Sequence, residues 1–180
     1  MLPAAKFFDA DEAAHELVDL AEVREAIRRE FGDEVFSTSG DLNRAALRAI
    51  IFRDAAKKRA LEQILHPRIR REWRAEAEKH RNSPDFFFAD IPLLYETGGE
   101  MLCDRVVVVA CSPAVQLQRL LKRVGLAPEV AEQIIAAQMP LADKIKRADH
   151  VVWNDGPQQT LREQSELLVD LWRTEIWTKA

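Results

Sequence analysis

Two compact apolar runs limit what this chain can fold into. Phe86–Ile91 is apolar except for one aspartate, and Arg105–Ala110 contains four consecutive valines. Runs this short, rich in aromatic and β-branched residues, predict strands that are buried on both faces. Because helical segments separate them, their connections are crossovers and the sheet is parallel. The sequence therefore predicts an α/β fold built on a parallel sheet.

Two further strands and a set of helices complete the predicted framework. Lys6–Asp9 and Val151–Trp153 are the shorter strands. A helix from residue 11 to 31, broken near residue 19, should stop at Gly32, because glycine is the common residue just past a helix end. The other helices are expected to begin at good capping residues or at prolines, and a residue before proline resists helical geometry. These expected starts are Asp41, Asp54, Pro67 (a new helix after a junction at His66), Ser112-Pro113, Pro128 and Gln158.

Polar side chains follow the strands at their carboxyl ends. Ligands of open parallel sheets bind at this edge, so the sequence predicts a site there. The polar residues concerned are Asp9, Asp11, Asp90, Ser112, Asn154 and Asp155.

The distribution of charge is compatible with phosphate binding. The net charge is −4, which argues against general affinity for nucleic acid, yet residues 41–80 and 119–148 are each net basic. Basic segments in an acidic protein suggest local anion sites, although ordinary solvated helix faces explain them equally well. No apolar run is long enough to span a membrane. Cys103 and Cys111 do not form a CxxC motif, so we expect reduced cysteines of a cytosolic protein.

Five segments, taken together and in this order, resemble the dephospho-coenzyme A kinase family. They cover nearly the whole chain, and each is weakly specific alone. The segments are Phe8–Asp11 with the helix after it, Gly40–Arg44 leading to Phe52, Leu65–Ile69, Asp90–Glu96, and the long stretch from Gln118 through Arg123, Gln138–Leu141, Lys144 and Ala148-Asp149 to Asn154–Gly156.

The resemblance implies a P-loop kinase-type three-layer fold with a parallel sheet, a helical substrate-binding insertion and a lid. It implies transfer of the ATP γ-phosphate to the 3′-hydroxyl of dephospho-coenzyme A, the last step of coenzyme A biosynthesis, with Mg²⁺. It assigns residues 1–40, 84–118 and 146–180 to the kinase core, 41–83 to the insertion and 119–145 to the lid. The expected partners are ATP and dephospho-coenzyme A, without nucleic acid or membrane, in a cytoplasmic monomer or weak homo-oligomer.

The resemblance also suggests roles for the acidic residues. Asp11 is the candidate to accept the hydroxyl proton or to orient the attacking oxygen, although its position equally suits a helix N-cap. Asp9 is expected to support substrate binding or to contact the metal through water. Asp90 resembles the acidic residue that assists the metal in many P-loop proteins, and a turn or cap role is its alternative.

Basic and loop residues complete the implied site. Arg119 and Arg123 share one helix face and resemble lid arginines that grip ATP, with a solvated face as the alternative. Lys144 matches a basic residue of the second lid helix, and Asn154 and Gly156 match a loop that holds adenine or form a plain turn. The residues that match the dephospho-coenzyme A region are Arg44, His66 (which also suits a structural role), Pro92 and Leu93.

One part of the family pattern is absent from the chain. The family begins with a strand and the loop GxxxxGK[ST], but none of the six glycines here precedes a lysine. That strand lies in the middle of the sheet in P-loop kinases, and leaving its neighbours unpaired costs roughly 1–3 kcal/mol per buried backbone group. We therefore expect Met1 to be an internal methionine of a protein that starts about 20–25 residues earlier.

Three other functions stay open. The first is an inactive relative that binds coenzyme A precursors without turnover. The second is a P-loop kinase for nucleosides or shikimate-like alcohols. The third is a helical nucleic-acid-binding module formed by residues 41–81, which net acidity and the buried strands argue against.

Overall fold

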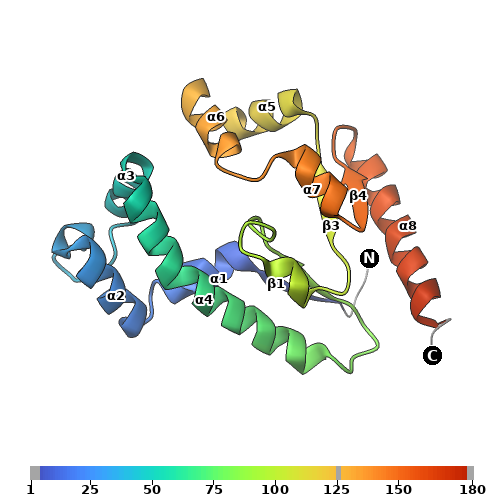
Figure 1. Cartoon of the computed structure of the whole chain (residues 1–180), viewed down its shortest axis with the longest axis horizontal. Coiled ribbons are helices and arrows are strands. Elements are labelled where there is room, and N and C mark those ends of the chain that lie inside the picture. Colours follow the sequence, from blue (N-terminus) through green and yellow to red (C-terminus); the bar gives the residue numbers. More distant parts are fainter. Residues whose placement is uncertain (1–4, 125–126, 178–180) are drawn as a thin grey trace. The chain divides into compact units, whose positions relative to one another are not determined.

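The computed structural model describes residues 5–124 and 127–177, and the chain divides into two compact units, Met1–Pro92 and Leu93–Ala180 (Figure 1). Each unit contains one parallel strand pair with helices. The first unit contains β1 (Lys6–Asp9), α1 (Ala10–Leu17), α2 (Ala21–Phe31), η1 (Asp33–Val35), α3 (Arg44–Arg53), α4 (Ala55–His80) and β2 (Phe87–Asp90). The second contains η2 (Gly99–Leu102), β3 (Val107–Ala110), α5 (Pro113–Val124), α6 (Pro128–Ala136), α7 (Leu141–Arg147), β4 (His150–Trp153) and α8 (Gln158–Trp177).

The parallel pairing expected from the sequence is confirmed in both units. In the first unit β1 pairs with β2, so that Asp9 lies opposite Asp90. In the second unit β3 pairs with β4, and Val107 lies opposite His150. All four strands lie where strands were predicted, but the predicted burial of β2 and β3 on both faces is wrong: no residue of β2 is buried, and Val109 of β3 is 62 % exposed. The described residues form two such pairs, each with its carboxyl ends at one edge.

The helices of the first unit share a hydrophobic core. Val23, Ile27 and Val35 are fully buried, and Phe31 and Leu47 are nearly so. Partly buried side chains of α3 and α4 pack against this cluster. The break predicted near residue 19 is confirmed, because α1 ends at Leu17 and α2 begins at Ala21. The core of the helical region therefore draws on α2 and η1 as well as on α3 and α4.

Two predicted helix ends are confirmed and one predicted cap is wrong. Gly32 ends α2 with a φ of 81°, a left-handed conformation that glycine adopts without steric cost. The carboxylate of Asp54 accepts hydrogen bonds from the first N–H groups of α4. Asn43, not Asp41, caps α3, because its Oδ1 accepts from the Ala46 N–H. The Asp41 carboxylate is instead occupied by the Ser39 hydroxyl, at 2.9 Å.

The predicted helix junction at Pro67 is also wrong. α4 runs unbroken for 26 residues and contains Pro67 in its interior, as its long ribbon in Figure 1 shows. Proline has no N–H to donate to the carbonyl four residues earlier, here that of Gln63. One residue on, the guanidinium of Arg68 donates to the Ile64 carbonyl at 2.6 Å. This hydrogen bond lies one residue from the carbonyl that the proline leaves without its helical donor, and α4 continues through this turn.

In the second unit, α7 and the segment before β3 cover the β3–β4 pair. Tyr95, Val106, Val108 and Ala110 form a buried cluster. Apolar residues of α7 pack against it, among them Ile145. Helices α5 and α6 contact each other, and α8 contacts β4. The hydrophobic residues of α7 thus join the stretch before β3 to the sheet.

The described part of the chain contains no helix with the length and apolar character that a membrane span requires. The assignment of residues 41–83 to a substrate-binding insertion and of 119–145 to a lid stays a prediction.

Candidate functional site

The carboxyl ends of β1 and β2 bring three carboxylates into one region of the first unit. Asp9 and Asp90 are opposite each other in the parallel register, and neighbouring strands lie about 4.8 Å apart. Asp11 follows two residues after Asp9, in the first turn of α1. Three of the acidic residues singled out in the sequence therefore converge at the edge where open α/β sheets bind ligands.

Asp9, not Asp11, is the N-cap of α1. Its Oδ1 accepts hydrogen bonds from the backbone N–H groups of Asp11 (2.8 Å) and Glu12 (3.0 Å). The capping alternative for Asp11 is therefore wrong. Asp11 is exposed, and its carboxylate makes no hydrogen bond or ion pair with any residue that the structure describes. The capped first turn leaves this carboxylate available for a ligand.

The electrostatics of this edge favour a cation. Although Asp90 keeps contact with solvent, partial burial raises the pKa of its carboxyl, and the charges of Asp9 and Asp11 raise it further. A cation at this position would relieve that repulsion. Within residues 5–124 and 127–177, no group of three or more acidic, histidine or cysteine side chains is arranged as a metal cage. The donor set fits a cation that takes one or two carboxylates and fills its other positions from a bound substrate.

Arg44 is connected to the helix that carries Asp11. Its guanidinium donates to the His15 carbonyl at 3.2 Å and pairs with Asp19 at 3.5 Å. The Nδ1 of His15 in turn donates to the carbonyl of Asp11 at 2.8 Å. Arg44 therefore lies near the carboxyl half of α1, and its side chain is about half exposed. A role in substrate binding stays a prediction.

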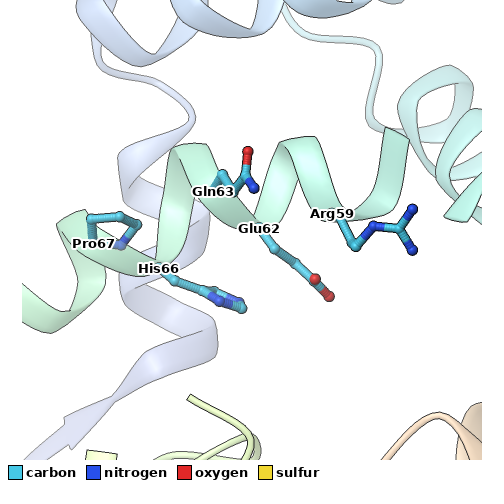
Figure 2. A pocket seen from close by; sticks show the side chains of 5 residues that line it. All are labelled: Arg59, Glu62, Gln63, His66 and Pro67. Atoms are coloured by element: carbon cyan, nitrogen blue, oxygen red, sulfur yellow. The ribbon is translucent and has the colours of Figure 1, made fainter. Parts of the chain in front are cut away.

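His66 lines an open pocket of about 310 Å³ on α4. Figure 2 shows the side chains of Glu62 and His66 extending to the same side of the helix, with Arg59 one turn further on. The remaining lining residues are Gln63 and Pro67. The pocket combines a guanidinium, an imidazole and one side-chain amide, which can donate to phosphate and amide oxygens, with the carboxylate of Glu62, which accepts hydrogen bonds from amide or hydroxyl groups.

The residues of the second unit that were predicted to bind ATP differ in their exposure and in the bonds that their side chains already make. Arg119 is exposed on α5, whereas the side chain of Arg123 lies outside the described residues. Lys144 pairs with Glu96, with 2.9 Å between Nζ and Oε1. These two side chains are only 15 % and 21 % exposed. Lys144 is therefore held by a carboxylate that was not assigned a role from the sequence.

The predicted adenine loop is tied to the start of α5. Asn154 donates its backbone N–H to the Ala110 carbonyl at 2.7 Å. The Oδ1 of Asp155 accepts from both the backbone N–H (2.7 Å) and the hydroxyl (3.1 Å) of Ser112. Asp155 was among the polar residues expected at this edge of the sheet, whereas Glu96 was given no role from the sequence. Both of their partners are 43 residues away in the chain, and no local pattern reveals a contact at that distance.

Pro92 is the last residue of the first unit and Leu93 the first of the second. Their predicted contact with the substrate stays a prediction.

Comparison with known proteins gives one consistent result. The family described as Dephospho-CoA kinase matches residues 4–160. A Dephospho-CoA kinase of Symbiobacterium thermophilum is 43 % identical over 166 residues, which cover 91 % of this chain and 70 % of that protein. A Dephospho-CoA kinase of Bacillus cereus is 38 % identical over 91 % of this chain and 83 % of that protein.

Solved structures agree with these relatives. The crystal structure of TT1252 from Thermus thermophilus has a TM-score of 0.74 and 30 % identity, covering 93 % of this chain and 84 % of that one. The Dephospho-CoA kinase from Campylobacter jejuni has a TM-score of 0.70 at 23 % identity, covering 96 % of this chain and 87 % of that one. The second likeness supports the fold alone.

Proposed function

Because the chain belongs to the dephospho-CoA kinase family, we propose that it transfers the γ-phosphoryl group of ATP to the 3′-hydroxyl of dephospho-CoA. The observation that carries this proposal is the available carboxylate of Asp11. It follows the carboxyl end of β1 in a helical turn that Asp9 caps. Such a carboxylate suits a hydroxyl acceptor, because phosphoryl transfer requires positioning and charge neutralisation more than covalent help.

The reaction forms one bond and breaks one. The 3′-oxygen of dephospho-CoA attacks the γ-phosphorus of ATP, and the bond from that phosphorus to the bridging oxygen of the β-phosphate breaks. ADP leaves, and the hydroxyl proton passes to the Asp11 carboxylate and then to solvent. Asp11 thus orients the attacking oxygen and takes its proton, while the Asp9 cap fixes the turn that carries Asp11.

Asp90 is the candidate to hold Mg²⁺ together with the substrate phosphates. Mg²⁺ in kinase sites takes one or two carboxylates and completes its shell with phosphate oxygens and water. The carboxylates at the edge of β1 and β2 fit that requirement, because Asp9 lies opposite Asp90 in the parallel register and the charges of Asp9 and Asp11 add to the effect of burial in raising the pKa of Asp90. Bound Mg²⁺ would neutralise charge on the β- and γ-phosphates.

Basic residues in both units would hold the anionic substrates. Arg119 is exposed and suits the ATP phosphates through bidentate hydrogen bonds, with Arg123 one helical turn further on. Arg44 and the pocket around His66 suit dephospho-CoA, whose diphosphate and amide groups match guanidinium and imidazole donors. Asn154 and Gly156 would contact adenine. ATP as phosphate donor and a cytoplasmic location belong to this proposal.

A substrate panel tests the proposal. The protein is incubated with ATP, Mg²⁺ and dephospho-CoA, and the products are separated by chromatography with mass detection. We expect CoA and ADP in equal amounts, and no turnover with CoA, whose 3′-hydroxyl already carries a phosphate. Turnover of adenosine or shikimate in place of dephospho-CoA would assign a different kinase. Calorimetric binding of dephospho-CoA without any product would instead indicate a binding protein.

A further inference from the structure

Two carboxylates hold the two ends of the α5–α6 pair, which we define as the helices α5 (Pro113–Val124) and α6 (Pro128–Ala136). One belongs to the loop after β4 and the other to the segment before β3, and neither lies on α5 or α6 themselves. Each accepts a backbone N–H at one end of the pair together with a donor from a side chain. The pair carries Arg119, which is proposed above to contact the phosphates of ATP.

At the start of the pair, Asp155 fixes the residue before α5. Its Oδ1 accepts the Ser112 N–H at 2.7 Å and the Ser112 hydroxyl at 3.1 Å. The backbone of the same loop is anchored to β3, since the Asn154 N–H donates to the Ala110 carbonyl. The direction in which α5 leaves the sheet is thus set by a side chain of the β4 loop.

At the end of the pair, Glu96 fixes Met139, which lies three residues after the last residue of α6. Its Oε1 accepts the Met139 N–H at 2.8 Å and also pairs with Lys144 of α7 at 2.9 Å. Lys144 lies 3.5 Å from the Gln138 side-chain oxygen as well. Partial burial raises the pKa of Glu96, but the Met139 and Lys144 hydrogen bonds together lower it below its ordinary value. The charged carboxylate is therefore the favoured form, and it links the end of α6 to α7.

The two anchors rest on well-packed parts of the second unit. Tyr95, next to Glu96, belongs to the buried cluster around β3. Arg147 of α7 lies over the Tyr95 ring at 4.4 Å and pairs with Glu100. Glu96 thus extends from a well-packed segment, and Asp155 from a loop that Asn154 bonds to β3, toward two helices that contact each other. A small displacement at either anchor would move the whole pair, and with it Arg119.

We propose that Glu96 and Asp155 are positioning residues, which orient the α5–α6 pair so that Arg119 meets the phosphates of ATP. This inference rests on the proposed kinase function. It assigns neither carboxylate a contact with substrate. Loss of either anchor should therefore weaken productive ATP binding more than the chemical step.

The test compares truncations, conservative variants and a control. E96A and D155A remove an anchor completely. D155N keeps an acceptor for both Ser112 donors, whereas E96Q keeps the Met139 acceptor but loses the charge that faces Lys144. Glu129, an exposed carboxylate on α6, supplies the control E129A, which removes the same charge from the pair itself. Steady-state kinetics with ATP varied give KM and kcat separately, and amide exchange is followed at Ser112 and Met139.

We expect E96A and D155A to lower kcat/KM for ATP by roughly ten-fold to a hundred-fold, mostly through KM, the size that misplaced groups remote from the chemistry produce. D155N should keep kcat/KM for ATP within about three-fold of the unchanged protein, because the partners of Asp155 are the neutral donors of Ser112. E96Q should fall between D155N and the alanine variants, because it also loses the ion pair with Lys144. E129A should match the unchanged protein. The Met139 amide should exchange faster only in the Glu96 variants, and the Ser112 amide only in the Asp155 variants.

Several outcomes would overturn the inference. Unchanged KM for ATP in folded E96A and D155A would do so, as would equal losses in E129A. If both alanine variants fail to fold, the comparison of D155N with E96Q becomes the test. Equal KM values for ATP in these two variants would refute the inference. A protein that shows no phosphoryl transfer would refute the proposed function alone. Site-specific exchange and calorimetric ATP binding would then still decide whether the anchors position the pair.

Discussion

The backbone N–H of Asp11 donates to the carboxylate of Asp9 at 2.8 Å, so that two aspartates separated by one residue take different tasks. The carboxylate of Asp9 accepts hydrogen bonds from the N–H groups in the first turn of α1, whereas the carboxylate of Asp11 stays available for a ligand. Replacing Asp11 by asparagine should lower kcat by about 10²–10⁴-fold, the range for loss of a general base. The melting temperature should not change, because the Asp11 side chain is exposed. Phosphoryl-transfer kinetics and thermal denaturation on the same preparation check both expectations.

Asp9 provides the matched control for that experiment. D9A removes the cap and should lower the free energy of unfolding by about 1 kcal/mol, whereas D9N should cost little because asparagine caps helices equally well. Urea denaturation measures both. If D9N lost activity as deeply as D11N, the division of tasks between the two aspartates would be wrong.

Asp90 should make the fold less stable as the pH rises, which is the opposite of the usual effect of an aspartate whose pKa is lowered on folding. Its pKa is raised above the ordinary value of 3.8 by burial first and by Asp9 and Asp11 next. The neutral carboxyl of Asp90 contributes stability that is fully present below the ordinary, unfolded-state pKa. This contribution is lost as the pH rises through the higher pKa of the folded state. D90N should therefore melt higher than the unchanged protein at pH 7, with a difference that shrinks toward zero as pH falls to about 4.

Melting temperatures of both proteins across pH 4–8 measure this effect. D85N is the control, since Asp85 is an exposed carboxylate in the turn before β2. A D90N difference that is independent of pH, or that D85N reproduces, would contradict the electrostatic explanation.

Cys103 should be a poor nucleophile at neutral pH. Burial, followed by the charges of Asp104, Glu100 and Asp149, raises its pKa to about 11. Only about one molecule in a thousand then carries the thiolate at pH 8, and the thiolate is the reactive form. In a C111S background, alkylation by iodoacetamide at pH 8 should be much slower for the folded protein than for the same protein in urea. Equal rates would show that the Cys103 thiol is not protected.

Tyr95 offers a test of its buried hydroxyl. The Oη atom is buried and finds no hydrogen-bond partner among the described residues, while the ring still lies under the Arg147 guanidinium at 4.4 Å. Y95F removes the hydroxyl and keeps the ring, so stability should be unchanged or higher by up to about 1 kcal/mol. Y95L, which also removes the cation–π contact, should be less stable than Y95F in urea denaturation. A loss of more than about 1 kcal/mol in Y95F would reveal a hydrogen bond to the hydroxyl.

The sequence predicted the order and type of the strands and helices more accurately than it predicted the helix caps and boundaries. The apolar runs around β2 and β3 form strands as predicted and Gly32 ends its helix as expected, because these signals act locally; burial on both faces, which depends on neighbouring elements, was predicted wrongly. The cap of α3 was misassigned since Asp41 and Asn43 are equally suited by type, and only the fold shows that Ser39 occupies Asp41. The helix end predicted at Pro67 was wrong, because whether a proline ends a helix depends on the tertiary contacts of the turn around it.

The presence of acidic residues at this edge of the sheet could be predicted, but the separate roles of Asp9 and Asp11 could not. Parallel strands place the residues at their carboxyl ends together whatever the detailed geometry, which is why Asp9 and Asp90 were found. The capping role of Asp9 depends on the torsion angles of one turn. The anchors Glu96 and Asp155 depend on contacts across 43 residues, which only the folded chain brings together.

The proline inside α4 has a mechanical consequence. A 26-residue helix is about 39 Å long, and its resistance to bending comes from the unbroken series of backbone hydrogen bonds. That series is interrupted at the Gln63 carbonyl, which has no N–H donor at Pro67, and the Arg68 side chain bonds to the neighbouring Ile64 carbonyl without restoring the missing hydrogen bond. Thermal bending of α4 should therefore concentrate at this turn. Since Gln63, His66 and Pro67 also line the pocket on α4, the curvature of the helix and the shape of that pocket change together.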